Sequence, residues 1–237
     1  ADSIRQMKVD IGLGDTSATV DVELMMALLS MKQFRLLSAY GGKPAIRQAQ
    51  QAINRGYKNY TGIIPTDGLY GREMNTALIQ VLQAIEGYTP AEATGNFGAG
   101  TRAKLRTISS GTNQWVWLAT VNLVCNGYSI LPTSTWNSGI SNTLWQFQQA
   151  HALPVTGVVD PTTWMSLLTS KGDPNRPCVA CDTRFEITDE LAGHLKADGY
   201  QIVGRYLSEP NQSSKSEADY FKALRTGELE RIVGHGL

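Results

Sequence analysis

The sequence repeats itself, and this repeat limits the folds that the chain can adopt. Residues 143–170 predict an apolar helix, a short loop and a second helix, and residues 3–31 show the same order. The matching pairs are Ile4 with Leu144, Met7 with Phe147, Val20-Asp21 with Val159-Asp160, and Leu28-Leu29 with Leu167-Leu168. A one-residue gap in the loop aligns all of them. Such periodicity predicts small helical units that pack on one another.

Two fuller copies lie between these segments. Apolar residues at helical spacing predict a helix over 45–57 and, after a Gly-rich turn in each case, a helix within 67–87 and a short helix within 94–105. Helices are predicted again over 115–128, 136–153 and 160–170. Asp160 followed by Pro161 is typical of a helix start. We therefore expect part of a repeat over 1–43, which places the start of the chain inside a unit. Complete units follow over 44–111 (unit 1) and 112–172 (unit 2).

Short motifs recur at equivalent places in the two complete units. Gly56-Tyr57 corresponds to Gly127-Tyr128, and Leu82-Gln83 corresponds to Phe147-Gln148. Unit 1 also has Gln50 in its first helix and the "DGLYG" turn at 67–71. On these motifs the units resemble the peptidoglycan-binding-like domains, three-helix modules of bacterial and phage cell-wall enzymes. Unit 2 departs from the pattern, with Val121 in place of Gln50 and "TSTWNSG" in place of "DGLYG".

The resemblance implies contact with peptidoglycan, which offers sugar faces and peptide amides. Aromatic rings next to hydrogen-bonding groups suit such a surface. Tyr60 and Tyr70 are the candidate rings and Asp67 a candidate polar contact, although Asp67 is more typical of a turn or a helix N-cap than of a ligand contact. Tyr57 and Tyr128 share a repeat position, which favours a packing role for both.

The helical pattern ends after residue 172, and residues 173–237 predict strands. "CVACD", a helix capped by Thr188, and "QIVGRYL" have the order of a βαβ unit. Asp182-Thr183, "LKADGY" and Gly204-Arg205-Tyr206 carry a resemblance to glycoside hydrolase-like barrels of the lysozyme type. The expected fold class is therefore mainly α, with tandem three-helix units followed by an α/β segment that is the first part of a TIM-type barrel.

The barrel resemblance places Asp182 at the active face, where strands end. Glycoside hydrolysis generally needs two carboxylates, and Glu209 after the second strand is the second candidate, against the alternative of a solvated loop residue. Arg205 and Tyr206 are candidate substrate contacts, with a structural ion pair as the alternative for Arg205. Because the expected barrel is incomplete in this chain, we expect the chain to bind peptidoglycan but not to cleave it.

Composition excludes several other functions. The 21 Lys and Arg balance 21 Asp and Glu, which argues against a nucleic-acid partner that needs a basic face. No apolar run approaches a membrane span of about 20 residues. Cys178 and Cys181 have Cys-x-x-Cys spacing, but the histidines are scattered, so we expect buried thiols and neither a metal nor another cofactor.

Three functions remain open. The first is a cell-wall binding fragment of a peptidoglycan glycoside hydrolase, secreted, wall-associated or encoded by a phage. The second is a glycan-binding or anchoring protein whose barrel is not catalytic. In the third, the repeats only pack together as a spacer. A pull-down on peptidoglycan separates the third from the other two.

Overall fold

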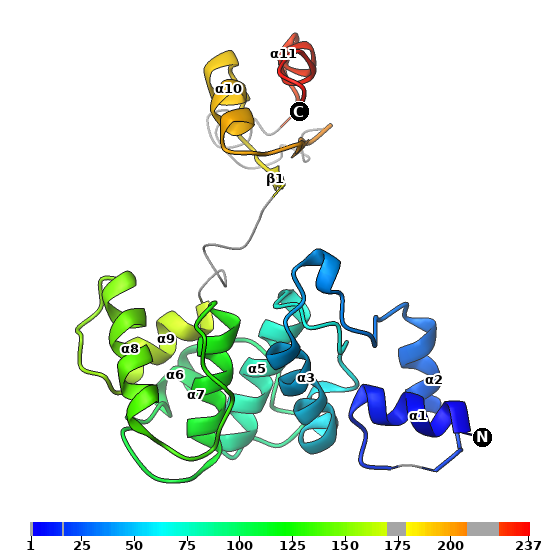
Figure 1. Ribbon diagram of the computed structural model, residues 1–237, viewed down its shortest axis with the longest axis vertical. Coiled ribbons are helices and arrows are strands. Elements are labelled where there is room, and N and C mark those ends of the chain that lie inside the picture. The colour runs from blue at the N-terminus through cyan, green and yellow to red at the C-terminus, as the bar shows by residue number, and fades with distance from the viewer. Residues whose placement is uncertain (1, 16, 170–178, 208–222) are drawn as a thin grey trace. The chain divides into compact units, whose positions relative to one another are not determined.

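The computed structural model describes residues 2–15, 17–169, 179–207 and 223–237. The chain divides into two compact units, Ala1–Arg176 and Pro177–Leu237, which we call the helical unit and the C-terminal unit (Figure 1). The described residues are mainly helical, with two short parallel strands in the C-terminal unit. This confirms the mainly α prediction.

The helical unit contains nine α-helices and one short 3₁₀ helix among its described residues. They are α1 (Asp2–Ile11), α2 (Val22–Leu29), the 3₁₀ helix η1 (Ser38–Tyr40), α3 (Pro44–Gly56), α4 (Lys58–Thr61), α5 (Arg72–Ile85), α6 (Ala99–Ala103), α7 (Gln114–Cys125), α8 (Ser138–Ala150) and α9 (Pro161–Thr169). The predicted helices of both complete units are present, with bounds shifted by a few residues. The sequence analysis missed α4, a single turn that continues α3 after a break at Tyr57.

Side-chain caps start several of these helices. The Asp160 carboxylate accepts a 2.7 Å hydrogen bond from the Thr163 amide, so the predicted helix start at this residue is confirmed. Asp21 caps α2 in the same way through the Leu24 amide at 2.8 Å. Such caps satisfy amides that lack a partner inside the helix.

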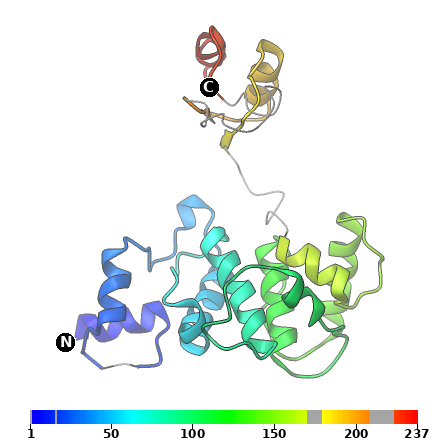
Figure 2. The ribbon, with the colours of Figure 1, turned by 180° about the vertical axis from the view of Figure 1, so that it is seen from behind.

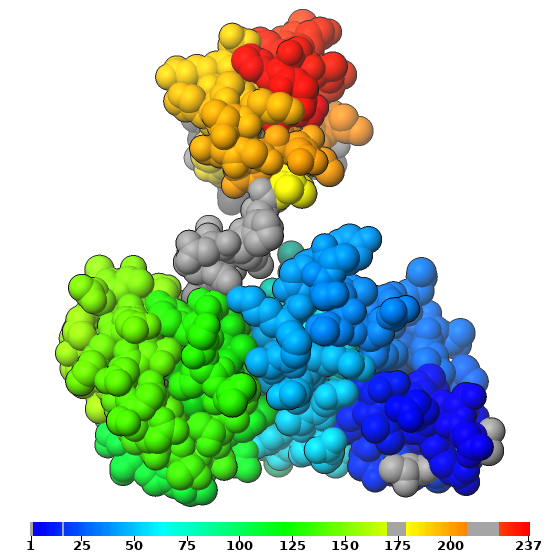
Figure 3. Space-filling view, in the orientation of Figure 1, coloured from blue at the N-terminus to red at the C-terminus, as the bar shows by residue number. Residues whose placement is uncertain are grey.

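The two complete units share one apolar core. Helix α5 of unit 1 packs on α7 of unit 2, and α9 packs on both. Helix α7 is apolar on nearly all sides and almost wholly buried, as expected for a helix surrounded by others. Tyr57 stacks on Trp117 across the two units, with ring centroids 6.3 Å apart. The units therefore form one continuous body (Figure 3).

The N-terminal segment, residues 1–43, which the sequence predicts to be part of a repeat, has a smaller core of its own around Ile11 and Leu24. It attaches to unit 1 through α1, which packs on α3. The Asn54 side chain, 1% exposed, donates to the Ile11 carbonyl at 2.8 Å, and Gln51 donates to the Asp10 carbonyl at 2.9 Å. From behind, α1 and α2 again lie at one end of the helical unit (Figure 2).

A buried glutamine recurs in the helical unit with the same bonding each time. Its amide oxygen accepts the N–H of a glycine in the following loop, and its amide nitrogen donates to a carbonyl of that loop. The three pairs are Gln50 with Gly68, Gln83 with Gly95, and Gln148 with Gly157, at 2.8, 2.9 and 2.9 Å. We call each of them a glutamine clamp. All three glycines have φ between +71° and +80°, a conformation that other residues rarely adopt.

The N-terminal segment has an ion pair in place of the glutamine clamp. The offset that matches Met7 to Phe147 places Lys8 at the position of Gln148. Lys8 is 2% exposed, and its ammonium donates to Asp15 at 2.5 Å and to the Ser17 hydroxyl at 3.0 Å. The hydrogen bond from Lys8, helped by the Ser17 amide, lowers the pKa of Asp15 to about 2.

The C-terminal unit has the predicted βαβ order. Strands β1 (Ala180–Asp182) and β2 (Ile202–Gly204) are parallel, and α10 (Asp189–Ala197) connects them. The Thr188 hydroxyl caps α10 through the Leu191 amide at 3.2 Å, as predicted. Helix α11 (Glu228–Gly234) follows, and its Ile232 packs with Ile187 and Ala192 in a small core. A barrel stays a prediction, because the described residues hold only these two strands.

Candidate functional site

The predicted catalytic aspartate lies at the exposed end of β1. Asp182 is paired in register with Gly204 of β2, and an added Cβ on Gly204 would come within 3.1 Å of the Asp182 Cβ. Its carboxylate is exposed to solvent. Glu209, the second predicted carboxylate, lies outside the described residues. Whether the two act together therefore stays a prediction.

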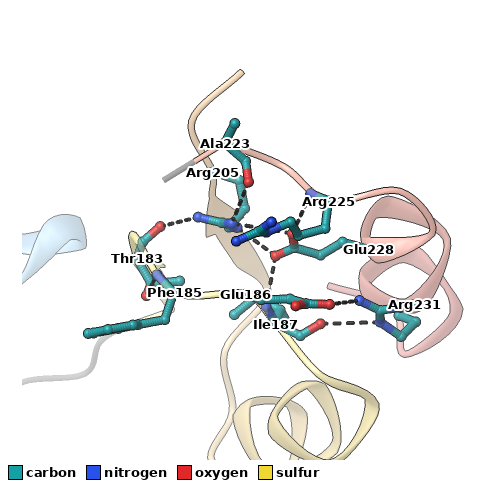
Figure 4. A network of polar contacts seen from close by, with 9 residues as sticks. All are labelled: Thr183, Phe185, Glu186, Ile187, Arg205, Ala223, Arg225, Glu228 and Arg231. Carbon is teal, nitrogen blue, oxygen red and sulfur yellow. Dashed lines mark hydrogen bonds and ion pairs between the residues drawn. The ribbon is translucent and has the colours of Figure 1, made fainter. Parts of the chain in front are cut away.

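Arg205 forms a buried ion pair with Glu228 (Figure 4). The Arg205 Nε atom lies 2.6 Å from Glu228 Oε1, and the side chains are 4% and 0% exposed. Arg205 also donates to the carbonyl oxygens of Thr183 at 2.6 Å and Ala223 at 3.3 Å. The guanidinium thus holds together the ends of β1, β2 and the segment before α11. These contacts match the ion-pair alternative for Arg205, and the substrate-contact role stays a prediction.

Glu228 is the centre of this network. Besides Arg205, it accepts the backbone amides of Ile187 at 2.7 Å and Arg225 at 2.8 Å. Burial of the Glu228 carboxyl favours its neutral form, but these hydrogen bonds outweigh burial and lower its pKa. A carboxylate that is ionised and fully paired stabilises the fold and has no free oxygen for acid–base chemistry.

Sequence reasoning missed Glu228. It is the first residue of α11 and lies 23 residues after Arg205, so no local spacing links the two. Glu186, the other carboxylate drawn in Figure 4, pairs with Arg231 at 2.6 Å. Asp182 is consequently the carboxylate at this end of the sheet that the described ion pairs leave available.

Two exposed aromatic rings, those of Phe185 and Tyr206, lie on the segments that follow β1 and β2. Tyr206 follows Arg205 and is 43% exposed, while its carbonyl accepts the Leu224 amide at 2.8 Å. Phe185 is 65% exposed and points away from the ion-pair network in Figure 4. An exposed ring near a carboxylate can cover a sugar face while the carboxylate takes a hydroxyl.

In unit 1 the structure gives Asp67 a turn role. Its carboxylate accepts the Gln50 amide at 2.8 Å and the Leu69 amide at 2.9 Å, so it belongs to the first glutamine clamp. Tyr70 is half-buried against the core, and its hydroxyl accepts the Asn75 amide at 2.8 Å. Tyr60 is half-buried on α4. Binding roles for these three residues stay predictions.

A groove between α4 and α5 offers a better surface for a ligand. Its volume is about 440 Å³, with a floor formed by Ile64 and Ala77. The rest of the lining is polar and consists of Thr61, Arg72, Glu73, Thr76 and Gln80. Arg72, Thr76 and Gln80 are spaced four residues apart on one face of α5, and this polar stripe was the signal that sequence reasoning overlooked.

The same surface of unit 2 presents an indole. The offset that matches Gln83 to Gln148 places Trp145 at the position of Gln80. Trp145 is 47% exposed and lies on Gly157, where an added Cβ would come within 2.2 Å of the indole nitrogen. Glycine at 157 is therefore required both by its φ of +71° and by this contact.

The structure also bears on metals and membranes. Within the described ranges, no group of three or more His, Cys, Asp or Glu side chains could hold a metal ion. Over the same residues, none of the helices has the length and apolar character needed to cross a bilayer.

Cys125 is buried, which raises the pKa of its thiol, whereas Cys178 lies outside the described residues.

Comparison with known proteins decides the family. The family described as FadG/YbfG, PGDB-like domain matches residues 39–168, more than half of the chain. The chain belongs to this family. The match spans both complete units and supports a peptidoglycan-binding-like domain for the helical unit. It ends before the C-terminal unit, so it carries no information about a barrel.

Two relatives of this FadG/YbfG-family chain come from Bacillus subtilis (strain 168). The uncharacterized protein YbfG is 40% identical over 211 residues, which cover 87% of this chain and 29% of YbfG. The uncharacterized protein FadG is 35% identical over 242 aligned residues, covering 100% of this chain and 41% of FadG. The chain thus spans less than half the length of either relative. No solved structure matches.

Proposed function

We propose that the helical unit binds peptidoglycan, and that the protein works in contact with the bacterial cell wall. The observation that carries this proposal is the PGDB-like family match over both complete units. The groove between α4 and α5 and the exposed Trp145 ring are the surfaces that we assign to the ligand. The location of the protein, whether secreted, wall-associated or phage-encoded, follows from this proposal and has the same support.

The chemistry of the two surfaces suits a wall fragment. Arg72 is exposed at the start of α5, where a guanidinium can bind a peptide carboxylate. Thr76 supplies a hydroxyl group. The Thr61 hydroxyl and the Gln80 amide nitrogen donate to the Gly62 and Ala93 carbonyls, so these two side chains offer their oxygens as acceptors for peptide amides or sugar hydroxyls. Trp145 can cover the apolar face of a sugar ring.

Co-sedimentation of the 237-residue chain with purified peptidoglycan sacculi tests this function. We expect the chain to pellet, Arg72→Ala and Trp145→Ala each to weaken binding by about fivefold to tenfold, and the two together to weaken it further. Arg102→Ala, at an exposed arginine of α6, is the matched control and should bind normally. A chain that stays in the supernatant would overturn the proposal, and loss with Arg102→Ala alone would overturn the assignment of the surfaces.

We propose in second place that the C-terminal unit belongs to a glycoside hydrolase domain in a longer protein, with Asp182 as one carboxylate. The exposed position of Asp182 at the end of β1 is the supporting observation. The competing proposal is non-catalytic glycan binding or anchoring. It is favoured by the exposed rings of Tyr206 and Phe185 and by the structural use of Glu228.

Assays on peptidoglycan distinguish the two. The 237-residue chain should bind without releasing reducing sugar, and release would refute that expectation. In a full-length protein, hydrolysis that is lost with Asp182→Asn supports the hydrolase, while binding without hydrolysis supports the glycan-binding alternative.

A further inference from the structure

One repeat position covers the glycine of the glutamine clamp in both complete units. It lies three residues before the clamp glutamine, and it is Gln80 in unit 1 and Trp145 in unit 2. A Cβ added to Gly95 would come within 3.3 Å of the Gln80 Cγ atom, and one added to Gly157 would clash with the Trp145 indole. We call this position the clamp cover. The same place in the fold thus presents an amide in one unit and an indole in the other.

The face of α5 around Gln80 is charged. Glu73 pairs with Lys32 at 2.5 Å, whereas the described ion pairs do not include Arg72, which is exposed at the start of the helix. The groove between α4 and α5 therefore has one guanidinium that no described carboxylate neutralises. The Gln80 amide nitrogen donates to the Ala93 carbonyl at 3.2 Å, which leaves the amide oxygen as an acceptor. Such a groove suits a ligand that brings a carboxylate and N–H donors.

The equivalent positions in unit 2 have no charge. The offset that matches Gln80 to Trp145 places Asn137 at the position of Arg72. The Asn137 side chain caps α8 by accepting the Ile140 amide at 3.2 Å, so it does not replace the free guanidinium. Helix α8 as a whole contains no Asp, Glu, Lys or Arg. A ligand on this helix therefore meets no ionised side chain from α8.

Uncharged amides flank the indole of unit 2. Asn142 and Gln149 are exposed, and they lie three residues before and four residues after Trp145, so all three side chains share one face of α8. The indole itself is 47% exposed. An aromatic ring covers the apolar face of a sugar, while neighbouring amides can bond to its hydroxyl and acetamido groups. The α8 face therefore suits an uncharged glycan.

We propose that the two complete units bind different parts of peptidoglycan. Unit 2 binds the glycan strand, because its clamp cover is the indole of Trp145. Unit 1 binds a carboxylate of the stem peptide, because its clamp cover is the amide of Gln80 and the free guanidinium of Arg72 lies in the same groove. This inference rests on the proposed function, the binding of peptidoglycan by the helical unit.

Two soluble probes test the inference by NMR on the isotope-labelled 237-residue chain. The first is a tetramer of N-acetylglucosamine, which has neither charge nor peptide. The second is a synthetic stem peptide with free carboxylates, and its fully amidated form is the control. We expect the tetramer to shift the Trp145 indole signal and the stem peptide to shift the amides of Arg72 and Gln80, each without effect on the surface of the other unit. The amidated peptide should shift neither, because it offers Arg72 no carboxylate.

Variants assign each probe to its surface. Trp145→Gln gives unit 2 the clamp cover of unit 1, and it should weaken tetramer binding at least about fivefold while stem-peptide binding stays unchanged. Arg72→Gln should have the reverse effect. The controls are Tyr40→Gln, at a ring 78% exposed outside both surfaces, and Arg102→Gln, at the exposed arginine of α6. Both controls should bind the two probes normally, and all four variants should keep the native circular dichroism.

Co-sedimentation with sacculi distinguishes a failure of this inference from a failure of the proposed function. If the chain pellets with sacculi but the two probes shift the same residues, or neither probe binds, the division between the units is overturned and the proposed function stands. Equal loss of both probes in Trp145→Gln would also overturn the division. A chain that fails to pellet would overturn the proposed function, and this inference with it.

Discussion

The helical unit and the C-terminal unit bury polar side chains in different ways. The helical unit repeats a neutral device, the glutamine clamp, in which Gln50, Gln83 and Gln148 each bond to loop backbone. The C-terminal unit depends on a charged device, the ion pair of Arg205 with Glu228. Loss of an amide leaves a few unsatisfied backbone groups, whereas loss of one charge leaves the other buried without a partner. The C-terminal unit should therefore be the more sensitive of the two to a single substitution.

The largest effect is expected for Glu228→Ala. Removal of this carboxylate leaves the Arg205 guanidinium buried and two backbone amides without acceptors, which should destabilise the C-terminal unit by about 3–5 kcal/mol. Hydrogen exchange of residues 180–204 measures this loss as faster exchange of the amides in β1, α10 and β2. All five tryptophans lie in the helical unit, so the tryptophan-detected unfolding of that unit should stay unchanged.

Glu230→Ala is the matched control for this substitution, since Glu230 is an exposed residue of the same helix. It should leave the exchange pattern as in the native chain. Equal protection in Glu228→Ala and Glu230→Ala would show that the buried pair contributes little, and the contrast between the two units would fail.

The second largest loss of stability is expected for Gln148→Ala. Gln148 accepts the amides of Thr156 and Gly157 and donates to the Val158 carbonyl, so its loss leaves buried groups unpaired. We expect a loss of about 2–3 kcal/mol in the free energy of unfolding. Urea unfolding monitored by tryptophan fluorescence measures this loss. Gln149→Ala, at the exposed glutamine next to it, should cost less than about 0.5 kcal/mol. Equal losses in the free energy of unfolding for Gln148→Ala and Gln149→Ala would show that the glutamine clamp does not stabilise the helical unit.

The smallest effect concerns Glu86, whose two carboxylate oxygens are buried without a hydrogen-bond partner. Burial raises the pKa of this carboxyl from 4.5 to about 7, although Lys104 acts against the shift. The folded state thus favours the protonated form. The stability that Glu86 contributes is full below about pH 4.5 and is lost as the pH rises through 7.

Glu86→Gln should therefore stabilise the chain by about 1 kcal/mol at pH 8.5 and change little at pH 5, as measured by urea midpoints. Glu92→Gln is the control: hydrogen bonds from Thr89 lower the pKa of Glu92, so its replacement should bring no gain at high pH. A gain from Glu86→Gln that is the same at pH 5 and pH 8.5 would contradict the ionisation account.

Sequence alone predicted the elements that local chemistry specifies. Apolar spacing located the helices of both complete units, and the caps at Asp160 and Thr188 were correct because capping depends on residues three apart. The alignment of Gln83 with Gln148 matches two residues that make the same hydrogen bonds in the structure, although the sequence did not show what those bonds are. The matching of α1 and α2 to unit 2 as part of a repeat stays a prediction.

The rest depends on contacts between distant residues. Nothing in the sequence connects Arg205 to Glu228, and α4 is a single turn without a period of its own. Asp67 has the residue type of a ligand contact, yet the structure uses its carboxylate in a turn. The groove between α4 and α5 depends on how these two helices pack, which the sequence does not show.

The helical unit is proposed to contact the wall polymer through α5 and α8. Amide chemical shifts of the labelled 237-residue chain, recorded during titration with a soluble peptidoglycan fragment that carries both glycan and stem peptide, test it most directly. We predict the largest shifts around Arg72, Thr76 and Gln80 of α5 and around Trp145 of α8. Shifts confined to the C-terminal unit, or none at saturating fragment, would contradict it.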